Sequence, residues 1–183
     1  NFVGVIVANE VLDALPVQRF CIQQDAVHAL GVIGTAQGLA WATQPASESL
    51  RSAVNVLQQA TGVALPEGYC SEINLQLPQW IASLAMAMQR GVLLFIDYGY
   101  PQSQYYSAER AHGTLSCFFR QRLHDNPFIN LGLQDITAWV DFTAVAEAGL
   151  AAGLELKGFA TQAHFLFGCG LDRLLAGMSE QGD

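Results

Sequence analysis

The sequence contains few positive charges. Its 183 residues hold 8 Lys and Arg against 16 Asp and Glu, which gives a formal net charge of −8 at pH 7. Such a surplus of negative charge repels phosphate backbones and anionic lipid headgroups. We therefore expect neither nucleic acid nor a membrane surface as a partner.

Long hydrophobic runs are also lacking. The longest, Val3–Ala8 and Val92–Ile96, have the length of strands and are far shorter than the roughly 18 residues of a membrane-spanning helix. The chain opens with Asn1-Phe2-Val3, already inside a hydrophobic strand, and not with a signal-peptide pattern. We expect a soluble protein with further sequence upstream.

Closely spaced metal or redox ligands are missing as well. No CxxC pair and no HExxH motif occurs, which removes support for zinc-ribbon, thioredoxin and zinc-protease interpretations. We predict no metal site, and reduced thiols in a cytoplasmic protein. The isolated residues are Cys21, Cys70, Cys117, Cys169, His28, His112, His124 and His164.

The segments that are present alternate between strand and helix patterns. Val3–Ala8 and Val92–Ile96 are continuous apolar runs, typical of parallel strands buried on both faces, and we expect the first to be central. Residues 17–43 predict an antiparallel meander. Apolar spacing predicts helices over Ser47–Ala60 and Pro78–Met88. In the second helix we expect a core stripe of Trp80, Leu84 and Met88.

The second half of the chain is less periodic. Residues 98–134 predict a long ordered loop segment, and such loops tend to be functional. Asp141 is placed to cap a helix over Phe142–Ala152. A short strand is expected at Leu154–Lys157 and a helix over Thr161–Ala176, interrupted near Gly168.

Polar residues follow both buried strands. Asn9, Glu10 and Asp13 come after the first, where Leu12 and Leu15 have helical spacing, and Asp97 follows the second. In a doubly wound α/β sheet, ligands bind beyond the carboxyl ends of the strands, so these side chains predict a ligand edge. Since the sequence has no GxSxG, Walker or GxGxxG motif, this argument locates a site but no reaction.

Several motifs, in one order along the whole chain, resemble the MidA-like family of class I S-adenosylmethionine-dependent methyltransferases. Mitochondrial members of that family are arginine methyltransferases that assist assembly of respiratory complex I. The motifs are ANEVLDALPV (8–17), GYCSEIN (68–74), RG (90–91), IDYGY (96–100), GTL (113–115), DNPF (125–128), GLQDIT (132–137), VDFT (140–143) and TQAHFL (161–166).

The resemblance implies that residues 1–183 are the C-terminal part of one class I methyltransferase domain with S-adenosylmethionine as cofactor. Val3–Ala8 and Val92–Ile96 would be the fourth and fifth strands of an incomplete sheet, with the meander at 17–43 as an insertion. The first three strands and the glycine-rich cofactor loop would lie upstream, and the last strand is also expected to be absent. Gln121 and Trp139 stand where the family pattern has His.

The same resemblance gives roles to the residues of the predicted ligand edge. Glu10 would be the catalytic carboxylate that grips a guanidinium group, with Asp13 in place of a second glutamate. Asn9 and Asp97 would contact the cofactor. The alternatives are structural: Asn9 and Glu10 at the start of a helix, and Asp97 satisfying the turn through Gly99.

The resulting prediction is methyl transfer from S-adenosylmethionine to a protein arginine, in the cytoplasm or, in a eukaryote, the mitochondrial matrix. The alternatives are a non-catalytic assembly or binding protein with the same fold, which Gln121 and Trp139 favour, and methylation of a small molecule. Because the strand at Phe2–Ala8 would lose its neighbour, we expect the isolated chain to self-associate or rearrange, and to bind the cofactor weakly or not at all.

Overall fold

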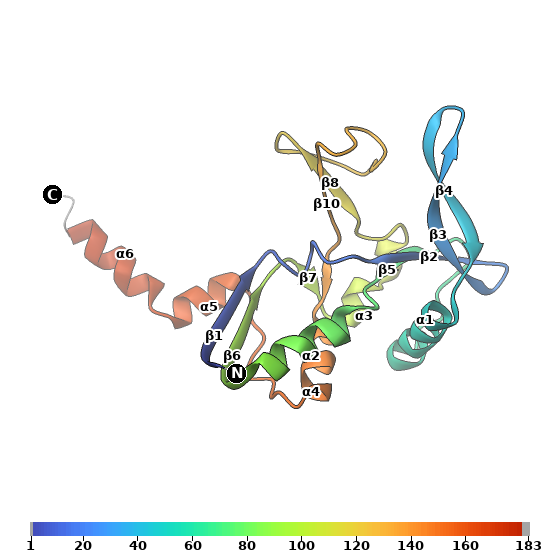
Figure 1. Cartoon of the computed structure of the whole chain (residues 1–183). Coiled ribbons are helices and arrows are strands. Elements are labelled where there is room, and N and C mark those ends of the chain that lie inside the picture. The colour runs from blue at the N-terminus through green and yellow to red at the C-terminus, as the bar shows by residue number, and fades with distance from the viewer. Residues whose placement is uncertain (1, 181–183) are drawn as a thin grey trace.

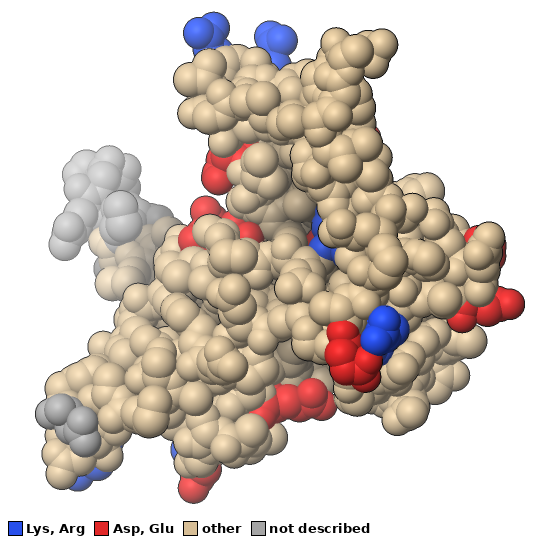
Figure 2. All heavy atoms as spheres, turned by 45° about the vertical axis from the view of Figure 1, so that its right-hand side comes forward, with Lys and Arg blue, Asp and Glu red and all other residues tan. Residues whose placement is uncertain are grey.

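The computed structural model describes residues 2–180 and shows an α/β protein in which short sheets and helices follow one another along an extended molecule (Figure 1). On the face shown in Figure 2 most of the surface is uncharged, and acidic side chains occur at more places than basic ones. None of the helices within residues 2–180 has the length and apolar content needed to cross a membrane.

A parallel pair of strands carries the predicted ligand edge. β1 (Phe2–Asn9) and β6 (Met88–Ile96) pair in parallel along their whole length, up to Asn9 opposite Ile96. Gly91 allows this close approach, because a side chain there would overlap the carbonyl group of Gly4. The carboxyl ends of both strands therefore meet at one edge, as expected from the sequence.

The burial of β1 differs from the prediction. Val3, Val5 and Val7 are 57%, 62% and 59% exposed, so β1 is not buried on both faces. The reason is that β1 has a single neighbour, β6, among the described strands, and the described residues leave this face of the pair open.

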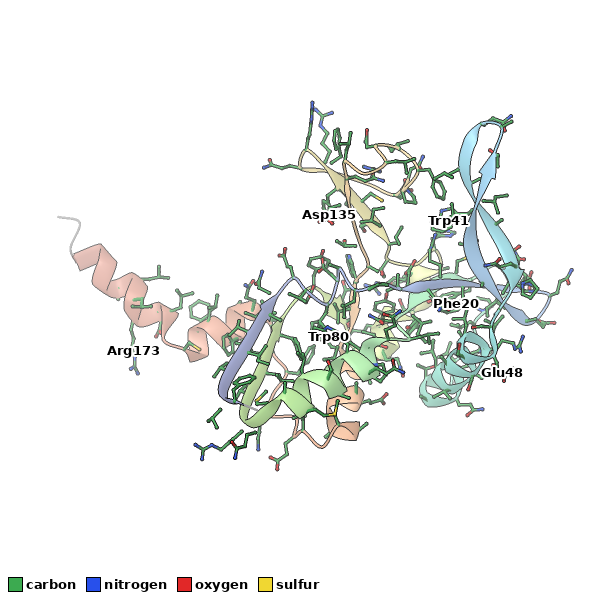
Figure 3. All side chains as sticks on the ribbon, in the orientation of Figure 1. Phe20, Trp41, Glu48, Trp80, Asp135 and Arg173 are labelled. Atoms are coloured by element: carbon green, nitrogen blue, oxygen red, sulfur yellow. A yellow bond between two sulfur atoms is a disulfide. The ribbon has the colours of Figure 1, made fainter. Side chains whose placement is uncertain are left out.

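α2 (Leu77–Ala87) packs against β6, and α4 (Phe142–Ala151) packs against α2. The two helices meet around Leu77, Ile81 and Val145. The predicted core stripe is only partly right. Trp80 packs on Phe95, with 6.0 Å between the ring centroids, and lies beside this core (Figure 3). However, Trp80, Leu84 and Met88 are each only half-buried. The helix ends at Ala87, and Met88 is already extended in β6, so it cannot continue a helical stripe.

The predicted meander is antiparallel. β2 (Gln18–Gln23), β3 (Ala26–Thr35) and β4 (Gly38–Pro45) pair in sequence, and β5 (Cys70–Ile73) adds to β2 to give the order β4-β3-β2-β5. α1 (Glu48–Thr61) covers one face of this sheet, where Phe20 is fully buried (Figure 3). The helix predicted over Ser47–Ala60 is thus confirmed with slightly different bounds: Ser47 caps it and left-handed Gly62 ends it.

The prediction of reduced thiols is wrong for two cysteines. Cys21 of β2 and Cys70 of β5 are register partners and form a disulfide, whereas Cys117 and Cys169 are free. The sequence separation of 49 between Cys21 and Cys70 hides this pairing, because β5 joins the meander only after α1 has crossed its face.

Residues 98–134 contain more regular structure than a loop. β8 (Ser116–Phe119), β9 (Arg122–His124) and β10 (Asp135–Thr137) form a three-stranded antiparallel sheet, which stands away from the parallel pair in Figure 1. Before it come β7 (Gly99–Tyr100), which pairs with β11 (Val140–Asp141), the one-turn helix α3 (Gln102–Tyr105) and the 3-10 helix η1 (Ala108–Arg110).

The C-terminal part consists of helices. Asp141 caps α4, as predicted, and the expected helical region is split into α5 (Gln162–Gly168) and α6 (Leu171–Glu180), which extend outward in Figure 1. The strand predicted at Leu154–Lys157 is wrong, since these residues pair with no described strand.

Candidate functional site

The end of β1 and the loop after it hold three of the four predicted site residues. The first residue of the loop, Glu10, has a positive φ of 50° and donates its backbone N–H to the carbonyl of Ile96 at 2.9 Å. Residues 10–16 then form bends and turns, so no helix begins here. The capping interpretation of Asn9 and Glu10 is therefore wrong, and both side chains are exposed at the carboxyl edge of the parallel pair.

Asp97 holds this loop through its carboxylate. Its Oδ2 accepts the backbone N–H groups of Leu12 (3.0 Å) and Asp13 (3.2 Å), and its Oδ1 accepts that of Tyr98 (2.9 Å). Burial, reinforced by the charge of Asp13, raises the pKa of the Asp97 carboxyl. Asp97 thus joins the ends of β1 and β6, and a contact between Asp97 and a cofactor stays a prediction.

Asp13 points inward from the same loop. It is 5% exposed, its Oδ2 accepts a short hydrogen bond from the Tyr98 hydroxyl, and its carbonyl accepts the N–H of Ala138 at 3.1 Å. Its other oxygen, Oδ1, is buried and accepts no hydrogen bond from the described residues. Burial, followed by the hydrogen bond to Asp13, raises the pKa of Tyr98 to about 12.

The structure therefore brings Asp13 and Asp97 together and leaves Asn9 and Glu10 exposed beside them. Sequence reasoning missed Tyr98, which links both carboxylates. Tyr98 directly follows Asp97 in the motif IDYGY (96–100), so its position was a signal. Nothing in that motif shows that its hydroxyl reaches Asp13, 85 positions earlier.

A second buried carboxylate was also missed. Glu72 is fully buried in β5; its Oε1 accepts a hydrogen bond from Arg19 Nε (2.8 Å) and its Oε2 one from the Thr114 backbone N–H (2.7 Å). Arg19 also donates to the carbonyl of His112 at 2.9 Å. Gly113 lies so close that any side chain there would collide with the Glu72 carboxylate. These contacts fix the loop after η1 against the meander sheet.

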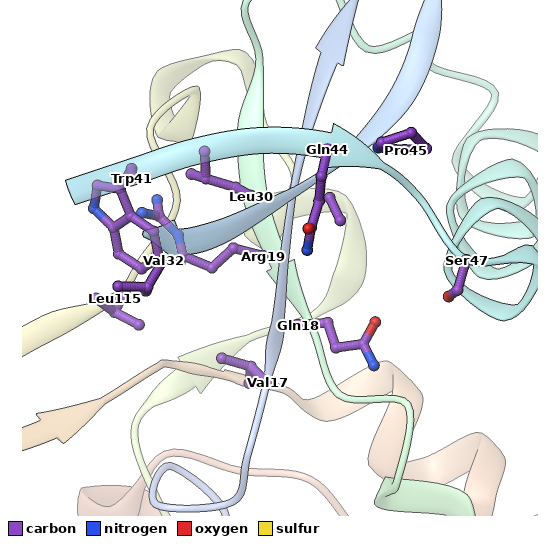
Figure 4. Close-up of a pocket in the computed structure, with 11 residues that line it drawn as sticks. Val17, Gln18, Arg19, Leu30, Val32, Trp41, Gln44, Pro45, Ser47 and Leu115 are labelled. Carbon is purple, nitrogen blue, oxygen red and sulfur yellow. The ribbon is translucent and has the colours of Figure 1, made fainter. Parts of the chain in front are cut away.

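A cavity of about 560 Å³ lies beside this ion pair, at the meander sheet (Figure 4). Its lining includes Arg19, Trp41 and Leu115. The guanidinium of Arg19 lies 4.7 Å from the centroid of Trp41, whose ring also packs on Phe128 at 5.0 Å. Glu72 neutralises the charge of Arg19. The other residues that line the cavity are mainly apolar or carry side-chain amides.

The two departures from the family pattern lie in different surroundings. Gln121 is exposed, with a φ of 64°, in the turn between β8 and β9. Trp139 is half-buried and stacks on Tyr100 at 5.2 Å, next to the guanidinium of Arg110. Within the described residues, no group of three or more His, Cys, Asp or Glu side chains is arranged to hold a metal ion.

Comparisons with known proteins give a consistent result. A family model described as "putative S-adenosyl-L-methionine-dependent methyltransferase" matches residues 1–160. A crystal structure from Burkholderia thailandensis, of a "likely methyl transferase" bound to S-adenosyl-homocysteine, is 38% identical over 99% of this chain, with a TM-score of 0.88. A native structure of an uncharacterised superfamily protein from the same organism is 39% identical over 96%, with a TM-score of 0.87.

This chain spans 46% of the length of each of these two solved structures. No curated protein sequence matches it.

Proposed function

This chain belongs to the family described as putative S-adenosyl-L-methionine-dependent methyltransferases, and we propose that the whole protein transfers a methyl group from S-adenosylmethionine to an arginine of a protein substrate. The observation that carries the proposal is the likeness, over 99% of the chain, to a structure that holds S-adenosyl-homocysteine. That molecule is what remains of S-adenosylmethionine after methyl transfer.

The described residues fit such a ligand. The carboxyl ends of β1 and β6 lie side by side, which is where ligands of parallel sheets bind. Asn9 and Glu10 are exposed there, and the buried Oδ1 of Asp13 is an acceptor that no described donor satisfies. When bound, S-adenosylmethionine supplies an activated methyl group on a sulfonium ion.

The choice of a protein arginine rests on the resemblance to the MidA-like family. In the proposed reaction a guanidinium nitrogen forms a bond to the methyl carbon, the carbon–sulfur bond breaks with its electron pair going to sulfur, and the nitrogen loses a proton. The work of the protein is to orient the nitrogen and exclude water. An exposed carboxylate at the strand end, Glu10, is suited to hold the other two guanidinium nitrogens in a bidentate contact.

The first test uses the whole protein and Glu10→Gln, which keeps the size of the side chain and removes its charge. We expect transfer of radiolabelled methyl groups to an identified arginine substrate to fall about 100-fold or more, equivalent to roughly 3 kcal/mol, because the paired charge orients the nucleophile. Titration calorimetry should show S-adenosyl-homocysteine binding by both proteins. Glu67→Gln, another exposed acid, is the matched control and should retain full activity.

The same experiment separates the alternatives. Gln121 and Trp139 depart from the family pattern and favour an assembly protein without turnover. That alternative predicts no methyl transfer to any protein substrate. Transfer to a small molecule, with no labelled protein, would support the third function. Turnover by Glu10→Gln equal to that of the wild type would remove Glu10 from the mechanism.

A further inference from the structure

Asp13 is a buried carboxylate with one oxygen that has no hydrogen-bond partner among the described residues. The residue is 5% exposed and lies in the loop after β1, at the carboxyl end of the parallel pair. One oxygen accepts from the Tyr98 hydroxyl, and the other accepts nothing within residues 2–180. A buried carboxylate oxygen without a donor is unfavourable, so such an atom indicates a missing partner.

The charge around Asp13 also lacks a counterpart. The neighbouring Asp97 is half-buried, and its three hydrogen bonds come from neutral backbone N–H groups. The ion pairs among the described residues are Arg19–Glu72, Arg51–Glu48 and Lys157–Glu155, and they involve neither carboxylate. Two acidic groups therefore lie together with no described cation beside them.

Thr137 adds a second polar group to the same place. It is 4% exposed, and its hydroxyl is close enough to the Tyr98 phenol to lower the pKa of that group, yet it makes no hydrogen bond of normal geometry. Asp13 Oδ1 and Thr137 Oγ1 are thus two buried oxygens beside the same tyrosine. This arrangement suits a ligand group that carries a positive charge and more than one N–H donor.

We propose that Asp13 Oδ1 binds a cationic nitrogen of a ligand at the carboxyl ends of β1 and β6. The inference rests on the proposed function, which supplies two such nitrogens: the guanidinium of the substrate arginine and the α-ammonium of the cofactor. Both present charged N–H donors to a carboxylate, and Glu10, exposed three residues earlier, lies on the same loop. The experiment separates the two sources.

The first measurement uses the wild-type whole protein and two pairs of probes in titration calorimetry. One pair is S-adenosyl-homocysteine and its deaminated analogue; the other is Nα-acetyl-arginine methylamide and the uncharged citrulline equivalent, both with saturating S-adenosyl-homocysteine. A charged hydrogen bond is worth roughly 1.5–3 kcal/mol, so the cationic member of one pair should bind about 10- to 100-fold more tightly.

The second measurement repeats the titrations with Asp13→Asn. The preference for the cationic probe should fall to within about threefold in the pair that showed it, because the amide carries no charge. The matched control, Asp25→Asn, changes the net charge equally in the exposed turn after β2, where a left-handed φ of 58° also suits Asn. It should keep the full preference. If circular dichroism shows that Asp13→Asn is unfolded, Glu10→Gln is titrated with the same probe pairs: a preference that survives this change supports Asp13, and one that disappears belongs to Glu10 and overturns the inference.

The outcomes distinguish this inference from the function on which it rests. If S-adenosyl-homocysteine binds but neither probe pair shows a preference, or if Asp13→Asn keeps the preference, the cationic subsite is overturned and the methyltransferase proposal stands. If S-adenosyl-homocysteine does not bind at all, both are overturned. A preference in the first pair assigns the subsite to the cofactor ammonium, and one in the second assigns it to the substrate guanidinium.

Discussion

Glu72 is a buried carboxylate that helps to hold the loop after η1 against the meander. It is fully buried and holds both Arg19, which is 13% exposed, and the backbone of Thr114. Removing one partner of a buried pair leaves the other charge uncompensated, which costs about 3–5 kcal/mol. We therefore expect Glu72→Gln to lower the free energy of unfolding by that amount in urea titrations of the whole protein.

The matched control is the exposed pair Arg51–Glu48, whose side chains are 48% and 84% exposed. Water screens such a pair, so Glu48→Gln should change the free energy of unfolding by no more than about 1 kcal/mol. Equal losses in the two variants would show that the buried pair Arg19–Glu72 contributes no more to the free energy of unfolding than the exposed pair does.

Single residues were predictable from the sequence only in part. Placing Asn9, Glu10 and Asp97 at one edge needs nothing beyond the parallel order of two strands, and the structure brings those strand ends together. Whether a side chain points outward, like Glu10, or inward, like Asp13, depends on a loop conformation that Asp97 imposes from 84 residues away. The residues next to Asp13 in the sequence do not indicate a contact with Asp97.

At the scale of elements, Asp141 offers a direct test of a helix that the sequence predicted. Its Oδ1 accepts the N–H groups of Thr143 (3.0 Å) and Ala144 (3.2 Å) at the start of α4. Asp141→Ala removes both bonds and should lower the free energy of unfolding by about 1–2 kcal/mol, whereas Asp141→Asn retains the cap. Chemical denaturation of the whole protein and both variants measures this difference.

The stabilities of the wild type and of Asp141→Asn should also depend differently on pH. Burial raises the pKa of Asp141, so the folded state binds its proton more tightly than the unfolded chain does. This contribution to the free energy of unfolding is present below the pKa of Asp in the unfolded chain, about 3.9. It is lost as the pH rises through the pKa of Asp141 in the folded protein. Since Asn does not titrate, the stability of Asp141→Asn relative to the wild type should increase with pH over that range. No such trend would mean that Asp141 is not desolvated.

Elements were predictable where a local pattern determines them. α1 has both its apolar spacing and its end signals, Ser47 and Gly62, in the sequence. The expected strand at Leu154–Lys157 fails because a strand requires a partner, and none of the described strands lies beside it. In place of the helix expected at Leu12 and Leu15 the chain forms a tight turn, in which Asp97 accepts the backbone N–H groups of Leu12 and Asp13.

At the scale of the whole molecule, the parallel pair has an open apolar surface. Val3, Val5 and Val7 of β1 alternate along one face at more than half exposure, and Val92 of β6 is 50% exposed. β1 has no second neighbour among the described strands, so its outer edge also presents unpaired backbone groups. Exposed strands of this kind readily pair with other chains.

We expect the isolated 183-residue chain to self-associate through this surface, or to rearrange to cover it, and to bind S-adenosylmethionine weakly or not at all. Light scattering measures the first property and titration calorimetry the second. Val5→Lys places a charge on the open face and should shift the mass towards the monomer, because a strand edge with Lys pairs poorly. Val56→Lys, at a 60% exposed position on α1, is the matched control and should not. A monodisperse wild-type monomer with micromolar affinity for the cofactor would show that β1 needs no further neighbour and that the described residues form a complete site.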